Sequence, residues 1–163
     1  MAIDYIPYMR KMIGHERMLS VGLSALIINE KEEVLLEKRS DNGLYCLPGG
    51  SIDLDEKVKE GVIREVFEET GLLLKKEDLH LFMIKSGKEM EIVYPNGDVT
   101  DYCDLVFFVR VNSKDVTLKS QDEESTSISF VSLASLPKVE EMLRGTMEPI
   151  QKYLKKNFEV EVD

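Results

Sequence analysis

The sequence has few cysteines, no tryptophan and no long apolar run. Cys46 and Cys103 are its only cysteines in 163 residues, too few for the disulfide framework of a small secreted domain. No stretch approaches the ~20 apolar residues that a membrane-spanning helix requires. The N-terminal segment also lacks the basic start and apolar middle of a secretory signal peptide. These absences predict reduced thiols, no membrane association and a cytoplasmic location.

Basic side chains are outnumbered by acidic ones. The chain has 21 Lys and Arg against 31 Asp and Glu, which gives a formal net charge of −10. Because non-specific binding to nucleic acid needs a basic surface, this charge disfavours long nucleic acid as a partner. A small anionic substrate is still compatible with this charge. It would need local positive charge, either from a few Arg and Lys side chains or from a metal ion.

The length and composition predict a single domain over residues 1–163. Hydrophobic residues make up 43% of the chain and charged residues 32%, as in ordinary globular proteins. Periodicity and turn signals predict an α+β fold. The expected elements are a helix at about 4–14, strands at 19–29 and 33–39, a loop at 40–50, a helix at 56–70, a strand at 79–86, a hairpin around Asn96-Gly97, a strand at 125–133 and C-terminal helical segments broken near Gly145 and Pro149.

The helix at 56–70 is the most informative segment. Asp53 or Asp55 is expected to cap its start, and Gly71 stands where a C′ glycine ends a helix. At about 100° per residue, three carboxylates share one sector of its surface. They are Glu65, Glu68 and Glu69, and the stripe expected to face the core is Val62, Ile63, Val66 and Phe67.

Clustered carboxylates can be explained in two ways. They can face open water, where their repulsion is screened, as most charge runs do. Alternatively, they converge on a divalent cation such as Mg²⁺, which prefers oxygen ligands. Pro48-Gly49-Gly50 lies just before the helix and offers backbone carbonyls, which are also good ligands for such a cation. Gly61 lies in the acidic sector and leaves space beside it.

The segment 50–72 resembles the Nudix box of the Nudix (MutT-like) hydrolases, and this resemblance decides between the two explanations. Seven fixed identities and two aliphatic positions match without a gap. They are Gly50, Glu56, Arg64, Glu65, Val66, Glu68, Glu69, Gly71 and Leu72. The wider likeness covers roughly residues 21–137. The fold that it implies is the Nudix α/β/α sandwich with a mixed β-sheet.

The resemblance also implies a cofactor and its ligands. Nudix hydrolases use Mg²⁺ or Mn²⁺, and the matching positions make Glu65 and Glu69 the first candidates for metal ligands. Glu68 comes next, and the carbonyl of Gly49 is a further candidate.

Further catalytic roles follow from the same resemblance. Arg64 is expected to orient a glutamate, and Glu56 either fixes the loop–helix junction through Arg64 or binds a metal through water. The general base is either a box glutamate such as Glu68 or a carboxylate from a later loop. Glu124 is the best candidate outside the box, and Glu123 is its rival.

Two positions outside the box are candidates for substrate binding. Arg39 ends a strand just before the loop into the box, where its guanidinium could reach a phosphate or could simply face solvent. Tyr94 and Tyr102 flank the Asn-Gly turn, and one of them could stack on a base, although a half-buried strand tyrosine is the more common case.

The resemblance implies a Mg²⁺-dependent hydrolase that cleaves the pyrophosphate of a nucleoside diphosphate linked to another group. One alternative is a pyrophosphohydrolase of nucleoside triphosphates or RNA 5′ ends, and another is a non-catalytic nucleotide sensor. The complete box disfavours the sensor. The secondary signatures of known substrate classes are absent, so the sequence leaves the nucleoside open. It also leaves open a homodimer, because the N-terminal helix could cover either the core or a partner subunit.

Overall fold

The computed structural model describes residues 4–120 and 123–163. Within them the chain forms three α-helices and nine β-strands. In chain order these are α1 (Tyr5–Ile13), β1 (Met18–Asn29), β2 (Glu33–Arg39), β3 (Tyr45–Cys46), β4 (Gly49–Ser51), α2 (Val58–Thr70), β5 (His80–Lys85), β6 (Glu91–Val93), β7 (Val99–Val111), β8 (Ser125–Ser132), α3 (Met147–Leu154) and β9 (Glu161–Val162).

All of these strands belong to one mixed sheet. Its main order is β3-β2-β1-β7-β5-β9, with β4 paired to β1, β6 to β7 and β8 to β2. The central pair, β1 and β7, is parallel along its full length. The pairs β1–β2 and β5–β7 are antiparallel. This arrangement confirms the predicted mixed sheet.

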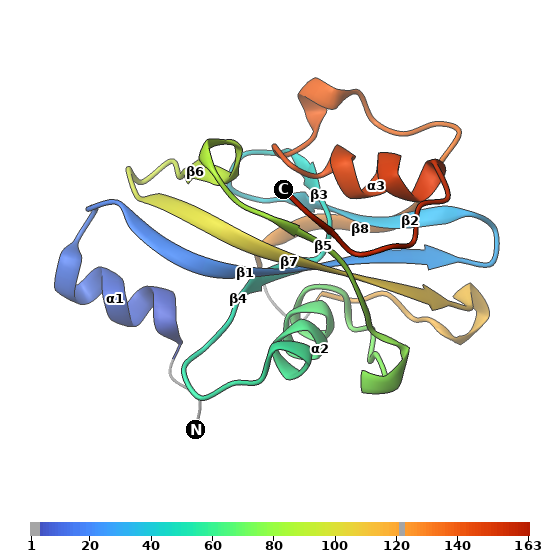
Figure 1. Ribbon diagram of the computed structural model, residues 1–163, viewed down its shortest axis with the longest axis horizontal. Helices are drawn as coiled ribbons and strands as arrows, with labels where there is room; N and C mark the ends of the chain where they lie inside the picture. The colour runs from blue at the N-terminus through green and yellow to red at the C-terminus, as the bar shows by residue number, and fades with distance from the viewer. Residues whose placement is uncertain (1–3, 121–122) are drawn as a thin grey trace.

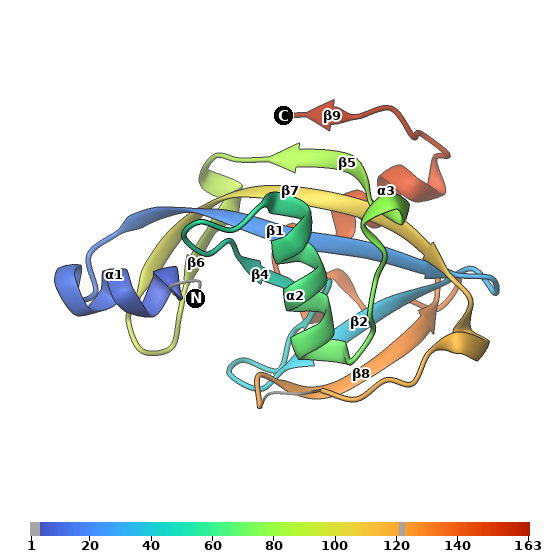
Figure 2. The same cartoon turned by 90° about the horizontal axis from the view of Figure 1, so that it is seen from below.

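Helices cover the two faces of the sheet, with α2 on one side and α3 on the other (Figures 1 and 2). Alternate residues of β1 point to opposite faces. Leu23, Ala25 and Ile27 pack with the cluster under α2, whereas Leu26 and Ile28 pack with the cluster under α3. The protein is therefore the α/β/α sandwich that the resemblance implies.

Most predicted elements are confirmed, but three segments differ. The expected loop 40–50 contains β3 and β4, which pair with β2 and β1. Pro149 lies in the first turn of α3, where the missing N–H costs nothing, so only Gly145, with φ +86°, marks a break. The C-terminal tail ends in β9, which pairs in parallel with β5.

The central helix also begins later than predicted. Its first residue is Val58, and Lys57 takes the N-cap position without a side-chain hydrogen bond, so neither expected aspartate caps the helix. Its end is as predicted, because Gly71 adopts the left-handed conformation with φ 74°. Phe67 is 42% exposed, and its placement in the core is wrong.

The N-terminal helix α1 is held against the end of the β6–β7 hairpin and the loop before α2. The Tyr5 N–H donates to Asp53 Oδ1 at 2.9 Å. Arg10 donates to the carbonyl of Val99 and the hydroxyl of Thr100, each at 2.9 Å. No helix among the described residues is long and apolar enough to cross a membrane.

Candidate active site

Two glycines of β4 bring the acidic side of α2 against the sheet. A Cβ on Gly50 would lie 2.5 Å from the carboxyl carbon of Glu65, and a Cβ on Gly49 would collide with the carbonyl oxygen of Leu23. The Gly49 N–H donates to Glu69 Oε2 at 2.6 Å. Glycine at position 50 therefore leaves room for the Glu65 carboxylate, whereas glycine at position 49 lets β4 lie close to β1.

Arg64 lies at the centre of a network of carboxylates. Its Nε and Nη2 atoms donate to the two oxygens of Glu56 at 2.8 and 2.9 Å. Its Nη1 atom donates to Glu65 at 2.8 Å and to Glu68 at 3.2 Å, and Asp53 lies 3.5 Å away. The network brings the predicted residues of the box together, although their predicted roles stay predictions.

Gly61 shows how closely α2 meets the sheet. A Cβ there would lie 2.5 Å from Leu23 Cδ1 and 2.8 Å from Glu56 Oε2. The space that the sequence predicts beside Gly61 is thus filled by β1 and by the carboxylate that binds Arg64.

A buried carboxylate that the sequence reasoning missed lies behind Glu69. Glu37 on β2 and Glu69 are each 2% exposed. Glu37 accepts hydrogen bonds from the thiol of Cys46 at 3.0 Å and the hydroxyl of Ser125 at 2.7 Å. The available signal was its position two residues after Leu35, since that alternation places it on the α2 face of a buried strand.

The surroundings of these carboxylates shift their pKa values upward. Burial raises the pKa of Glu65 to about 7, with Glu68 and Glu124 adding to the rise and Arg64 opposing it. Burial and then Glu37 raise the pKa of Glu69, and the hydrogen bond from Gly49 opposes this. These two carboxyl groups are therefore protonated more easily than an exposed glutamate, mainly because they are buried.

Part of this group of carboxylates lines a cleft of the molecular surface beside α1. Glu65, Glu68 and Glu124 are among the residues that line the cleft, whereas Glu69 is not. Glu123 does not line it, so the geometry separates Glu124 from its rival. In the described part of the chain, no group of three His, Cys, Asp or Glu side chains is arranged to hold a metal ion as it lies.

The chemistry of the donors nevertheless fits a hard divalent cation. All of the candidate ligands are oxygen atoms, which Mg²⁺ and Mn²⁺ prefer. Arg64 alone forms ion pairs with four acids, namely Asp53, Glu56, Glu65 and Glu68. A divalent ion would offset the remaining charge, and it would favour the ionised form of the buried carboxylates.

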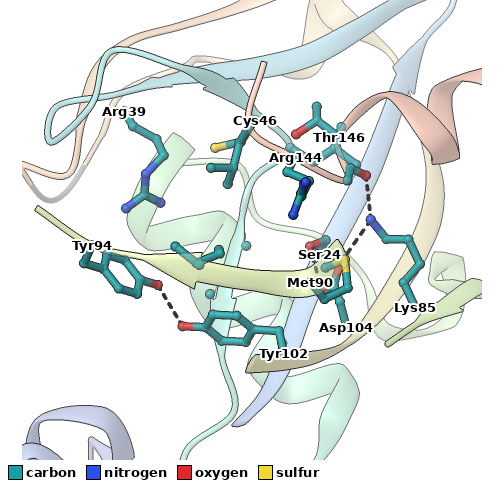
Figure 3. Close-up of a pocket in the computed structure, with 17 residues that line it drawn as sticks. Ser24, Arg39, Cys46, Lys85, Met90, Tyr94, Tyr102, Asp104, Arg144 and Thr146 are labelled. Carbon is teal, nitrogen blue, oxygen red and sulfur yellow. Dashed lines mark hydrogen bonds and ion pairs between the residues drawn. The ribbon is translucent and has the colours of Figure 1, made fainter. Parts of the chain in front are cut away.

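A second cavity, shown in Figure 3, adjoins the acidic cleft. The two share Arg39, Gly49, Gly50, Tyr94 and Tyr102 in their walls, and the cavity has a volume of about 110 Å³. Both substrate-binding candidates of the sequence therefore lie where the two spaces meet.

The side chains of these substrate-binding candidates form hydrogen bonds within the protein. Arg39 donates twice to Asp41, at 2.9 and 2.8 Å. The hydroxyl oxygens of Tyr94 and Tyr102 are 2.8 Å apart, and both side chains are half-buried.

Arg144 is a further cavity residue that the sequence reasoning missed. It lies just before α3, and Figure 3 shows it between Arg39 and Lys85. The other five arginines, 10, 17, 39, 64 and 110, all bind acceptors. Arg144 has no such partner among residues 4–120 and 123–163, and it lines the cavity.

The fold and the box agree with the comparisons with known proteins. The family model of the NUDIX domain matches residues 18–157, and the chain therefore belongs to the Nudix family. An ADP-ribose pyrophosphatase of Methanocaldococcus jannaschii is 34% identical over 116 residues, which cover 69% of this chain and 62% of that protein. A MutT-like protein of Streptomyces ambofaciens is 42% identical over 60 residues, which cover 37% and 39%.

Solved structures share the fold over a larger part of their length. The crystal structure of a MutT protein from Methanosarcina mazei is 29% identical, with a TM-score of 0.64, and the match covers 88% of this chain and 99% of that one. The chain spans less than two thirds of the length of the two curated relatives named above.

Proposed function

We propose that the protein hydrolyses the pyrophosphate bond of a nucleoside diphosphate linked to another group, with Mg²⁺ or Mn²⁺ as cofactor. The observation that carries this proposal is that two sites of opposite charge lie next to each other. An acidic cleft suited to a divalent cation adjoins a cavity lined by Arg39 and Arg144. A substrate that spans both would place its phosphates between the carboxylates and the arginines.

The cation would be held by Glu65, Glu68, Glu69 and the Gly49 carbonyl. When bound, it supplies neutralisation of phosphate charge and a more acidic water molecule.

The protein's own residues have three tasks. Arg64 orients Glu65 and Glu68 through the hydrogen bonds described above, as residues next to metal ligands commonly do. Arg39 and Arg144 bind phosphate oxygens, because a guanidinium suits that geometry. Glu124, which lines the acidic cleft, is the candidate base that takes a proton from the attacking water.

A substrate screen with identified products tests the function. ADP-ribose, nucleotide sugars, CDP-alcohols, dinucleoside polyphosphates and nucleoside triphosphates would be assayed with Mg²⁺ and with Mn²⁺. The expected products are a nucleoside monophosphate and a phosphorylated second group. Inorganic pyrophosphate as the main product would instead support a nucleoside triphosphate pyrophosphohydrolase, and no turnover of any substrate would contradict the proposal.

A matched pair of variants tests the metal ligands. Glu69→Gln keeps the size of the side chain and an oxygen that can accept from Gly49, but it removes the charge. We expect hydrolysis to fall by at least about 100-fold, as when a group essential to the transition state is removed. Glu60→Gln makes the same change on the same helix at a half-exposed residue paired with Lys76, and it should keep full activity. Equal activity in the two variants would refute the ligand assignment.

A further inference from the structure

The cavity next to the acidic cleft has a charged pair at one end. Asp104 of β7 is 6% exposed and Lys85 of β5 is 3% exposed. They are register partners in the β5–β7 pair, and Lys85 Nζ lies 4.0 Å from Asp104 Oδ2. Both line the cavity, at the end away from Arg39 and Tyr94 (Figure 3).

The two charged groups have unused hydrogen-bonding capacity. Ser24 donates to Asp104, with its Oγ 2.9 and 3.0 Å from the two carboxylate oxygens, but one hydroxyl supplies only one hydrogen. An ionised carboxylate can accept about four hydrogen bonds, and an ammonium group can donate three. Lys85 donates one, to the carbonyl of Gly145 at 2.5 Å. A ligand in the cavity can therefore use acceptors on Asp104 and a donor on Lys85.

Two glycines make room for these charged ends. A Cβ on Gly22 would lie 2.9 Å from Asp104 Oδ1, and a Cβ on Gly145 would lie 2.7 Å from Lys85 Nζ. Both glycines line the same cavity. The pair is thus held in its place by the backbone of β1 on one side and the turn before α3 on the other.

Apolar side chains also contribute to the cavity lining, namely Leu47, Met90, Ile92 and Leu143. Ligand sites typically combine apolar side chains with a few polar groups that fix the orientation of the ligand, and this combination suits a flat ligand with apolar faces and a polar edge. A nucleobase has this character, whereas a sugar presents hydroxyl groups in all directions.

We propose that this cavity binds a guanine base, with Asp104 accepting from the ring N1–H and the 2-amino group and Lys85 donating to O6. This inference names the nucleoside of the substrate and so rests on the proposed function. Guanine combines a carbonyl acceptor at O6 with the 2-amino donor, next to the N1–H. Two adjacent N–H groups match the two oxygens of one carboxylate, and neither adenine nor a pyrimidine offers that pair beside a carbonyl.

Binding of nucleoside 5′-monophosphates tests the inference. These compounds contain no pyrophosphate bond, so titration calorimetry can be done with Mg²⁺ without turnover. We expect GMP to bind about tenfold or more tightly than AMP, CMP or UMP. IMP lacks only the 2-amino group and should bind about tenfold more weakly than GMP, because it leaves a buried acceptor unpaired. Equal binding of GMP and AMP, or of GMP and IMP, would overturn the inference.

A pair of variants assigns the preference to Asp104. Asp104→Asn keeps the size but replaces one acceptor with a donor, and the advantage of GMP over IMP should disappear. Glu148→Gln removes a charge 3.8 Å from the same lysine, Lys85, outside the cavity lining, and the advantage should stay. A folded Asp104→Asn protein that still prefers GMP would contradict the assignment. If that variant does not fold, the ratio of GMP to IMP affinity in the unmodified protein decides alone.

The two proposals fail in different experiments. Guanine preference without hydrolysis of any substrate in the screen would contradict the hydrolase assignment and leave the cavity assignment in place. Hydrolysis with the same kcat/KM for nucleotide sugars that differ only in the base would support the hydrolase assignment and contradict the assignment of the cavity to guanine.

Discussion

The two faces of the sheet bury different kinds of side chain. Under α3, Ile150 and Tyr153 have no exposed surface, and they lie in a hydrophobic cluster. Under α2, Val62 and Val66 are buried in the same way, but the last turn of the helix carries Glu69, which is 2% exposed and lies near a second buried carboxylate, Glu37.

Aromatic contacts reinforce the α3 side. Phe82, Phe108, Tyr153 and Phe158 form a cluster with ring centroids 5.6 to 6.4 Å apart. Such pairs stabilise a protein beyond the burial of their surface. The α2 side has no comparable cluster among the described residues.

The difference indicates a division of tasks between the two faces. Burying carboxylates that share too few cations is costly, so the α2 face stabilises the fold less than its apolar residues alone would. The α3 face also buries a charged side chain, Lys152 at 4% exposure, but its ammonium group donates to the backbone carbonyls of Asn157 and Glu159. The comparison predicts that substitutions of buried residues of α3 lower the stability and leave the proposed hydrolysis intact. Substitutions in the Arg64 network should lower the hydrolysis and change the stability less.

The largest expected effect is on the α3 face. Ile150→Ala should lower the free energy of unfolding by about 2–5 kcal/mol, because it leaves a cavity in a fully buried cluster. The kcat/KM of the proposed hydrolysis should stay within about twofold wherever the variant is folded. Chemical unfolding and steady-state kinetics measure the two quantities. Lost activity with unchanged stability would contradict the division of tasks between the two faces.

The next effect tests the α2 face through Arg64→Lys. A lysine cannot bind both oxygens of Glu56 and also hold Glu65 and Glu68. The proposed hydrolysis should fall about 10–100-fold, as for other residues that orient metal ligands, and the apparent metal affinity should fall with it. Arg17→Lys, which changes an exposed ion pair with Asp101, is the control and should show neither loss. Activity and metal affinity unchanged in Arg64→Lys would remove this role for Arg64.

A smaller effect is expected from Gly50→Ala. The added methyl would lie 2.5 Å from the carboxyl carbon of Glu65. That carboxylate is the end of a flexible side chain, so we expect it to move at little cost in stability. Activity should fall about tenfold because the ligand is displaced, as is typical when the support of a metal ligand is disturbed. Ser51→Ala, at the next residue, adds no atom and should behave like the unmodified protein. Full activity in the Gly50→Ala variant would show that the contact with Glu65 is not needed.

The smallest effect concerns pH and an exposed contact of the α3 face. Hydrogen bonds from Tyr153 and Arg110 lower the pKa of Glu32 from its ordinary value of 4.5. A lowered pKa in the folded state stabilises the protein above the unfolded pKa, and this stabilisation is lost as the pH falls through the folded pKa.

Glu32→Gln tests that contact. It should lower the free energy of unfolding at pH 7 by less than about 1 kcal/mol, as is typical of exposed ion pairs. The melting temperatures of the variant and the unmodified protein should converge as the pH falls below about 4, since the carboxylate of the unmodified protein is then increasingly protonated. A difference that grows on acidification would contradict this sign.

Much of the α2 face could be predicted because its information is local. The spacing of Glu65, Glu68 and Glu69 and the glycine at position 71 depend on neighbours along one helix. Phe67 shows the limit of this reasoning. Its angular position suits the core, but the helix meets the sheet along Val62 and Val66, and Phe67 lies beyond that contact.

The importance of Glu37 could not be predicted in this way. Its acceptors are filled from β3 and β8, by Cys46 and Ser125. Those partners depend on which strands pair with β2 and in which register. One glutamate in an apolar strand does not reveal that register.

The sequence by itself determined the family and the acidic helix, because a box of fixed spacing folds into one helix and its preceding turn. Only the tertiary structure decided what that helix faces. Ser24, Lys85 and Asp104 come from three different strands, and the pairing of β1 and β5 with β7 brings them together. Such contacts between distant segments depend on strand order and register, which short-range patterns do not encode.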